Sequence, residues 1–126
     1  MHAIDTNVLV RLITRDEPKQ AAAADAFVEK GAWVSHIVLV EAAWVLVSVF
    51  DLTSMEIARA IEMLLNHESI VLQESEVVSA ALALLRKKPS LGFSDCLLLE
   101  IARKSGNLPL GTFDRNLGKI AGAVSL

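Results

Sequence analysis

The chain has 126 residues, 53% of them hydrophobic, and its formal net charge of −3 divides into an acidic half, Met1–Val78, and a basic half, Ser79–Leu126. This length suffices to bury a core without disulfides, and the single cysteine, Cys96, excludes an internal disulfide, so a reducing, cytoplasmic compartment is expected. The most apolar stretch, Ile37 to Phe50, contains Glu41 and is shorter than the roughly 20 residues of a membrane-spanning helix, which argues against a membrane protein.

In the first half of the chain, short apolar segments alternate with longer segments that have helical signals. Asp16 is a candidate N-cap for a helix with Pro18 in its first turn, and Gly31 is placed to end that helix. We expect strands at His2–Asp5 and Ala32–Ser35, and helices at Val8–Ile13, Pro18–Lys30 and Val38–Phe50.

The second half continues the alternation. Thr53 and Glu56 have the spacing of a capping box, and Ser75 is a candidate cap for the helix after it. We expect strands at Ile70–Leu72, Leu108–Thr112 and Ala123–Ser125, and helices at Ser54–Asn66, Ser75–Lys88, Phe93–Lys104 and directly after Asp114. Such alternation is typical of βαβ units, so the predicted fold is one α/β domain, residues 1–126, a three-layer α/β/α sandwich with a parallel sheet.

Two acids directly follow predicted strands. Asp5 comes after the first strand and Asp114 after the fourth. Either acid would also serve as the N-cap of the helix that follows it. Because ligands of parallel α/β sheets bind at the carboxyl ends of the strands, both acids are candidate site residues.

Glu41 is the only charged residue between Ile37 and Phe50. A helix that is apolar on all sides is expected to be buried, and a buried carboxylate needs a metal ion, a cation or a proton. No Lys or Arg lies within helical reach of Glu41. A long-range ion pair stays open as an alternative, and we favour a functional carboxylate.

Asp95 lies at the beginning of the predicted helix Phe93–Lys104, where the helix dipole favours an acid that has no other role. It precedes an apolar helix face, so we expect its side chain at the edge of the core. Together with Asp5, Glu41 and Asp114 it forms a set of four acids that a doubly wound fold would bring together.

Gathered carboxylates repel one another and raise each other's pKa unless a cation neutralises them. Oxygen ligands suit Mg²⁺ and Mn²⁺, which polarise phosphoryl oxygens and lower the pKa of bound water. Thr6, Asn7 and Thr112 lie beside the acids and offer hydroxyl and amide groups that position a phosphate. The residues therefore indicate a divalent-metal site suited to phosphodiester hydrolysis.

The segment Ile4–Arg11 resembles the opening of PIN-domain nucleases, especially the VapC-type toxins of bacterial toxin–antitoxin pairs. The resemblance continues through Glu41 on its hydrophobic helix, Ser94–Asp95 and Thr112–Arg115, and it spans essentially the whole chain. Each motif is weak by itself, whereas all four in this order and at these spacings are fairly specific.

The resemblance implies an α/β/α sandwich around a mostly parallel five-stranded sheet, commonly in a homodimer. It also implies Mg²⁺- or Mn²⁺-dependent endoribonuclease activity, and for the toxins a small antitoxin whose arginine enters the acidic site. Asp5, Glu41, Asp95 and Asp114 match the acidic quartet of the family. Our hypothesis is that Asp5 and Asp95 ligate the main metal ion and that Glu41 completes its shell directly or through water. Asp114 would orient or deprotonate the attacking water, and Thr112 matches the frequent hydroxyl residue two positions before it.

One position departs from the family pattern. Many relatives carry another acid shortly after the fourth one, where this chain has Asn116. An amide can still ligate a metal ion or a water, but the site then has one negative charge fewer. The missing charge makes binding of a second metal ion less expected than binding of the first.

The densest basic run, Arg86-Lys87-Lys88, lies at the end of a predicted helix, where the dipole favours cations. Contact with an RNA backbone is its functional interpretation, and solvated helix faces explain the same charges. Further candidates for RNA contact are Arg11, Arg15, Arg103 and Arg115. Packing roles are expected for Cys96, Trp33 and Trp44. A packing role is also expected for His36, with an approach to the active cleft as the alternative, because it lies near a strand end.

The leading hypothesis is a metal-dependent endoribonuclease, the toxin of a toxin–antitoxin pair, with RNA as its substrate. The second is a PIN-like module that binds RNA or protein with little nuclease activity. The third is a phosphatase or other Mg²⁺ hydrolase of unrelated fold, which lacks here the Asp-x-Asp pair of the commonest such family.

Overall fold

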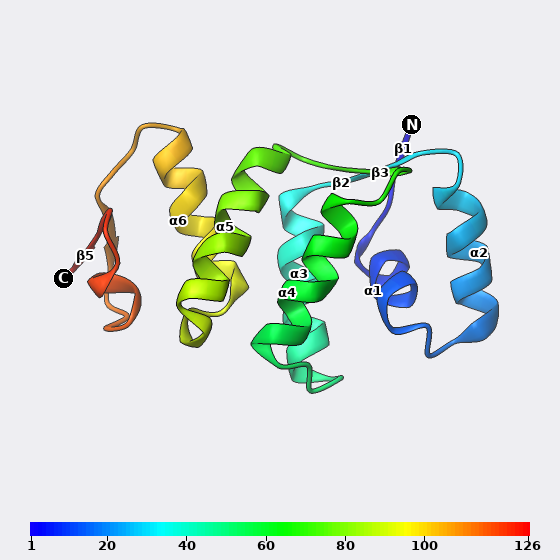
Figure 1. Ribbon diagram of the computed structural model, residues 1–126, viewed down its shortest axis with the longest axis horizontal. Helices are drawn as coiled ribbons and strands as arrows, with labels where there is room; N and C mark the ends of the chain where they lie inside the picture. Colours follow the sequence, from blue (N-terminus) through cyan, green and yellow to red (C-terminus); the bar gives the residue numbers. More distant parts are fainter.

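The computed structural model describes residues 1–126 and has six α-helices, two short 3₁₀ helices (η) and five strands (Figure 1). None of the helices combines the length and hydropathy required to cross a membrane. In chain order, the elements are β1 (His2–Ala3), α1 (Thr6–Thr14), α2 (Pro18–Val28), β2 (Ala32–Val34), α3 (His36–Ser48), α4 (Ser54–Leu65), β3 (Ile70–Leu72), α5 (Ser75–Lys87), η1 (Pro89–Leu91), α6 (Phe93–Lys104), β4 (Leu110–Thr112), η2 (Leu117–Lys119) and β5 (Ala123–Ser125).

All strand pairs are parallel, which confirms the predicted α/β class. The strands form two sheets, one with the order β1-β2-β3 and one in which β4 pairs with β5, so the five strands do not form one continuous sheet. Figure 1 places β5 and α2 at opposite ends of the long axis, with the other helices between them. The β4–β5 sheet packs near α6 and not beside the three-stranded sheet. There Leu117 is buried, and Arg103 of α6 donates to the carbonyl of Ala121 at 2.8 Å.

Alternation along β2 and β3 buries one face of the three-stranded sheet, since Ala32, Val34 and Leu72 are buried. The opposite face carries Trp33, which is 37% exposed, and Val71, which is 47% exposed. The prediction that Trp33 belongs to the core is therefore wrong. Helices α4 and α5 pack against β3, and α5 packs against α6, so the core lies between the buried sheet face and the helices.

The helix ends test the capping predictions. The capping box of α4 is confirmed, because the Thr53 hydroxyl accepts from the Glu56 N–H at 3.2 Å and Glu56 accepts from the Thr53 N–H at 2.9 Å. The predicted cap of α2 is wrong, since Asp16 bonds to Thr14 and Arg11 instead. The predicted cap of α5 is also wrong, because Ser75 is the first helical residue.

Candidate functional site

Asp5 lies directly after β1, as predicted, and is the N-cap of α1. Its Oδ1 accepts from the Val8 N–H at 3.0 Å, which satisfies one of the free amides at the helix start. The carboxylate lines an open hollow of about 410 Å³ between α1 and α2, together with Asn7, Arg11 and Phe27. Asp5 therefore has a local structural role and still faces open space.

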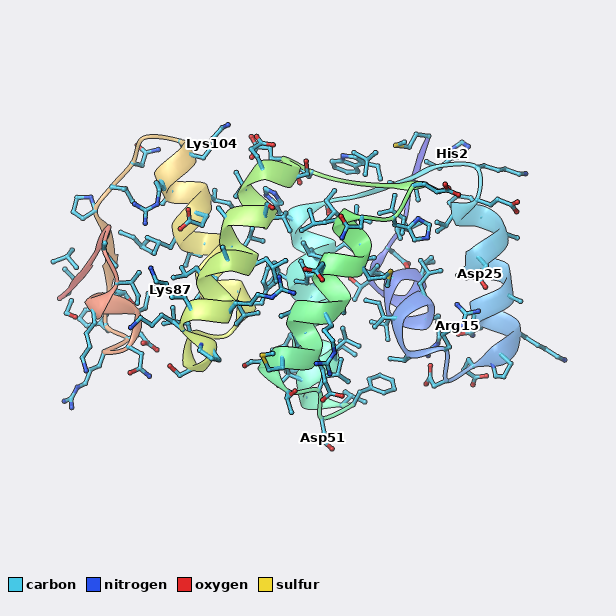
Figure 2. The ribbon with its side chains drawn as sticks, viewed as in Figure 1. His2, Arg15, Asp25, Asp51, Lys87 and Lys104 are labelled. Carbon is cyan, nitrogen blue, oxygen red and sulfur yellow. The ribbon has the colours of Figure 1, made fainter.

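The walls of this hollow are tied together by charged pairs. Arg15 donates to both carboxylate oxygens of Asp25, at 3.0 and 2.6 Å, and Figure 2 shows the two side chains facing each other across α1 and α2. These hydrogen bonds lower the pKa of Asp25. Arg11 donates to Gln20 at 2.7 Å and to Asp16 at 3.2 Å.

Glu41 is exposed, so the prediction of a buried carboxylate is wrong. Helix α3 buries only the face formed by Leu39, Ala42, Ala43 and Leu46. Its outer face is apolar as well, with Ile37 71% and Trp44 67% exposed, which also corrects the core prediction for Trp44. Glu41 lies among these residues without an ion pair or a side-chain hydrogen bond.

Glu41 and Asp95 line the same hollow of about 400 Å³ between α3 and α6. Asp95 occupies the first turn of α6, where an acid interacts favourably with the helix dipole. Burial nevertheless raises the pKa of Asp95, and the nearby charge of Asp114 raises it further. Because no cation is paired with either carboxylate of the hollow, a proton or an added cation would relieve this cost.

Asp114 follows β4, as predicted, in a loop that two hydrogen bonds hold in place. The Thr112 hydroxyl accepts from the Asp114 N–H at 3.0 Å, and Asp114 Oδ1 accepts from the Leu117 N–H at 2.8 Å. Asp114 is exposed, and its second carboxylate oxygen is free for another partner. Asn116 directly precedes η2 and is exposed to solvent.

The four acids thus divide into two places. Glu41 and Asp95 share one hollow, and Asp114 is close enough to influence Asp95. Asp5 lies in the other hollow with Asn7, and Thr6 is the half-buried first residue of α1. Nowhere does the structure bring three carboxylate, imidazole or thiol groups into a geometry that would hold one metal ion.

The candidate RNA-binding cations differ in how free they are. Arg86 pairs with Glu62 at 2.9 Å, and Arg11 is held by its partners beside α2. Lys87, Lys88 and Arg115 are exposed and belong to no ion pair. Of the predicted set, these three side chains have charges that no protein carboxylate neutralises.

Cys96 is fully buried, which confirms its packing role, whereas His36 is half-buried and lines the hollow of Glu41 and Asp95. His36 Nε2 lies 2.8 Å from the carbonyl of Gln73, and because a carbonyl only accepts, this nitrogen carries the proton. Burial raises the pKa of the Cys96 thiol to about 11, with smaller contributions from Asp95 and Glu100. The Cys96 thiol is therefore not poised as a nucleophile.

Sequence reasoning missed two residues that line the hollow of Asp5. Gln20 and Phe27 project from α2, and the Phe27 ring lies 5.6 Å from the ring of His2. Their positions in an alanine-rich helix carry no local signal of a site. Only the packing of α2 beside α1 places them there.

The protein is of the α/β class with parallel strands. Asp5 and Asp114 follow strands, Glu41 and Asp95 lie on helices, and none of the four carboxylates forms an ion pair. The family model of the PIN domain matches residues 3–123. The chain therefore belongs to the PIN domain family, whose members are typically nuclease-like. No curated protein matches the chain.

Proposed function

We propose that this PIN domain is a Mg²⁺- or Mn²⁺-dependent endoribonuclease with Glu41, Asp95, Asp114 and Asp5 as its acidic residues. The observation that carries the proposal is the pair of carboxylates, Glu41 and Asp95, in one hollow without a cation. Burial and, to a smaller extent, the charge of Asp114 raise the pKa of Asp95, and a divalent ion would offset both costs of the ionised carboxylate.

The donor set fits a hard divalent ion in its chemistry. Carboxylate oxygens are the ligands that Mg²⁺ and Mn²⁺ prefer, and Mg²⁺ keeps several waters, so one or two protein carboxylates suffice as direct ligands. Glu41 and Asp95 are the residues of the chain that would hold the ion. When bound, such an ion polarises a phosphoryl oxygen and neutralises the charge that develops on the leaving oxygen.

The chain's own residues supply the remaining functions. Asp114 keeps one carboxylate oxygen free while the other is fixed by the Leu117 N–H, so it is suited to orient an attacking water and take up its proton. Thr112 acts through Asp114, because its hydroxyl fixes the backbone of that loop. It is a positioning residue.

RNA is the proposed substrate, and exposed cations support this choice. Lys87, Lys88 and Arg115 belong to no ion pair, so they can bind phosphates without breaking a contact in the protein. Asn7 and Thr6 lie next to Asp5 and offer groups that position a phosphate near that acid.

The more specific assignment, a VapC-type toxin neutralised by a small antitoxin, belongs to the same proposal. The apolar outer face of α3, with Ile37 and Trp44 mostly exposed, supports a protein partner. A homodimer also belongs to this proposal. The cytoplasmic location expected from the single cysteine stays a prediction.

The test is cleavage of a mixed RNA pool at increasing concentrations of Mg²⁺ and Mn²⁺. Asp95→Asn removes a proposed ligand and should lower the metal-dependent cleavage rate at least 100-fold, as losing a dominant electrostatic contribution does. Glu29→Gln is the matched control, because Glu29 is exposed, unpaired and distant in sequence from every proposed site residue. Equal rates for Asp95→Asn and the parent would contradict the assignment.

A binding module with little nuclease activity is the second candidate. The separation of Asp5 from the hollow of Glu41 and Asp95 favours it, because no three ligating groups meet in the chain. This candidate predicts RNA binding without cleavage at any metal concentration. The same titration, read by gel shift and by product formation, separates the two candidates.

A further inference from the structure

Both sheets end in strands with unpaired backbone groups. His2 and Ile4 donate their N–H groups to Gly31 and Trp33 of the β2 side, so by the alternation of parallel strands the N–H and carbonyl of Ala3 point away from β2. Strand β1 pairs with β2 alone, which leaves this edge open.

Strand β4 has the same property. Leu110 donates to Gly122 and Thr112 accepts from Leu126, so both residues face β5, and the backbone groups of Gly111 point away from it. Strand β4 pairs with β5 alone. Open edges of this kind are pairing sites that folded proteins normally cover.

Apolar surface accompanies both edges. The hollow next to β1 is lined by Val8 and by Phe27, which is 43% exposed. Beside β4, Phe113 is 84% exposed and Leu126 is 73% exposed, with the Leu126 side chain lying over Gly111. Each open edge therefore has exposed hydrophobic side chains that a paired strand would cover.

The total accessible surface points the same way. It is 7225 Å² for a chain of 13.6 kDa. A compact monomer of this mass exposes about 6,600 Å². The chain therefore exposes roughly 600 Å² more surface than a compact monomer of its mass, as expected if part of that surface is covered by a second copy.

We propose that the open edge of β4 in one copy pairs in parallel with the open edge of β1 in a second copy, giving a strand-exchanged dimer. The same chain does not supply the partner strand here, because β4–β5 packs near α6, toward the end of the molecule opposite α2 (Figure 1). The exchange is reciprocal, so a two-fold dimer covers both edges of both copies. Each resulting sheet has the order β3-β2-β1 of one copy followed by β4-β5 of the other.

The register follows from which residues face outward. Aligning Ala3 with Thr112 lets the Ala3 N–H donate to the Gly111 carbonyl and the Phe113 N–H donate to the Ala3 carbonyl. This alignment places Asp5 of one copy directly opposite Asp114 of the other, at neighbouring strands about 4.8 Å apart.

The consequence for chemistry rests on the proposed function. Asp114 lies near Asp95, and Asp95 shares a hollow with Glu41, so these three acids come from one copy and Asp5 from the other. Neither copy contains the complete acidic set in one place. The dimer is then the active form.

Cross-linking tests the pairing without reference to activity. His2 and Gly111 are aligned in this register, and adjacent strands have a spacing that a disulfide spans. The double variant His2→Cys/Gly111→Cys should form a covalent dimer on oxidation, and so should a 1:1 mixture of the two single variants. Cys96 is fully buried and does not compete. Glu29→Cys is the control, which should remain uncross-linked.

Complementation tests the shared site. Asp5→Asn and Asp95→Asn are each expected to be inactive, but mixing equal amounts should restore about a quarter of the parent rate, since half the dimers are hybrids with one intact site of two. A disulfide formed within a single chain of the double variant, or a monomeric mass of the parent by light scattering, would overturn the exchange. A covalent dimer that never cleaves RNA would leave the pairing intact and refute the proposed function instead.

Discussion

The two hollows of this PIN domain differ in how their acids are satisfied. Beside α1 and α2, Asp5 caps a helix and the neighbouring Asp25 is neutralised by Arg15. Between α3 and α6, Glu41 and Asp95 have no cation and lie among apolar side chains. Carboxylates with local partners stabilise the fold, whereas the partly buried Asp95 carries an electrostatic cost that a proton or a bound cation relieves.

Metal binding should give the largest difference between the hollows. At 100 times its dissociation constant, Mg²⁺ should stabilise the parent by about 2.7 kcal/mol, and removal with a chelator should reverse this. Glu41→Gln should lose most of the stabilisation, whereas Glu29→Gln should retain it. The measurement is the free energy of unfolding by urea with and without Mg²⁺. An equal gain in Glu41→Gln and the parent would move the metal site away from α3 and α6.

Removing the cap should have the next largest effect, and it concerns the other hollow. Asp5→Ala leaves the Val8 N–H without its partner and should lower the free energy of unfolding by about 1 kcal/mol. Asp5→Asn should cost only a few tenths of that, because Asn caps as well as Asp. Denaturant melts without metal compare the two variants. If both were equally destabilised, the hydrogen bond to Val8 would not be the structural contribution of Asp5.

The smallest predicted effect is a pH-dependent change in stability at Asp95. Its pKa is raised in the folded chain by burial and by Asp114, so the folded chain binds the proton more tightly than the unfolded chain does. The parent should therefore lose stability as the pH rises from the ordinary Asp pKa through the raised one. Asp95→Asn lacks this loss and should melt roughly one to three degrees higher at pH 7 without metal.

Melting temperatures measured at low pH are the control for this prediction. Below the ordinary Asp pKa the parent carboxyl is protonated, and the two melting temperatures should converge. A difference between Asp95→Asn and the parent that is constant across pH would exclude the electrostatic explanation.

Local features of the fold were predictable from the sequence. The capping box of Thr53 and Glu56, the strand Ile70–Leu72 and the helix Phe93–Lys104 were all expected, because spacing and residue type within a few positions determine them. The positions of Asp5 and Asp114 directly after strands followed in the same way.

Long-range features were not predictable in the same way. The division of the strands into two sheets depends on where β4–β5 packs, which no local pattern encodes. The exposure of Glu41 was missed because α3 is apolar on all sides, although only one side packs against the core. The sequence of such a helix does not show which of its sides is buried. Which acids share a hollow depends on the packing of α3 against α6.

The buried thiol of Cys96 also gives the molecule an internal reporter of opening. With no exposed surface and a pKa of about 11, this sulfur is neither reachable nor ionised in the native state at neutral pH. Alkylating reagents will therefore modify it only when α6 separates from its neighbours. Because the chain has no other thiol, the rate of that modification measures how often α6, which carries Asp95, opens locally.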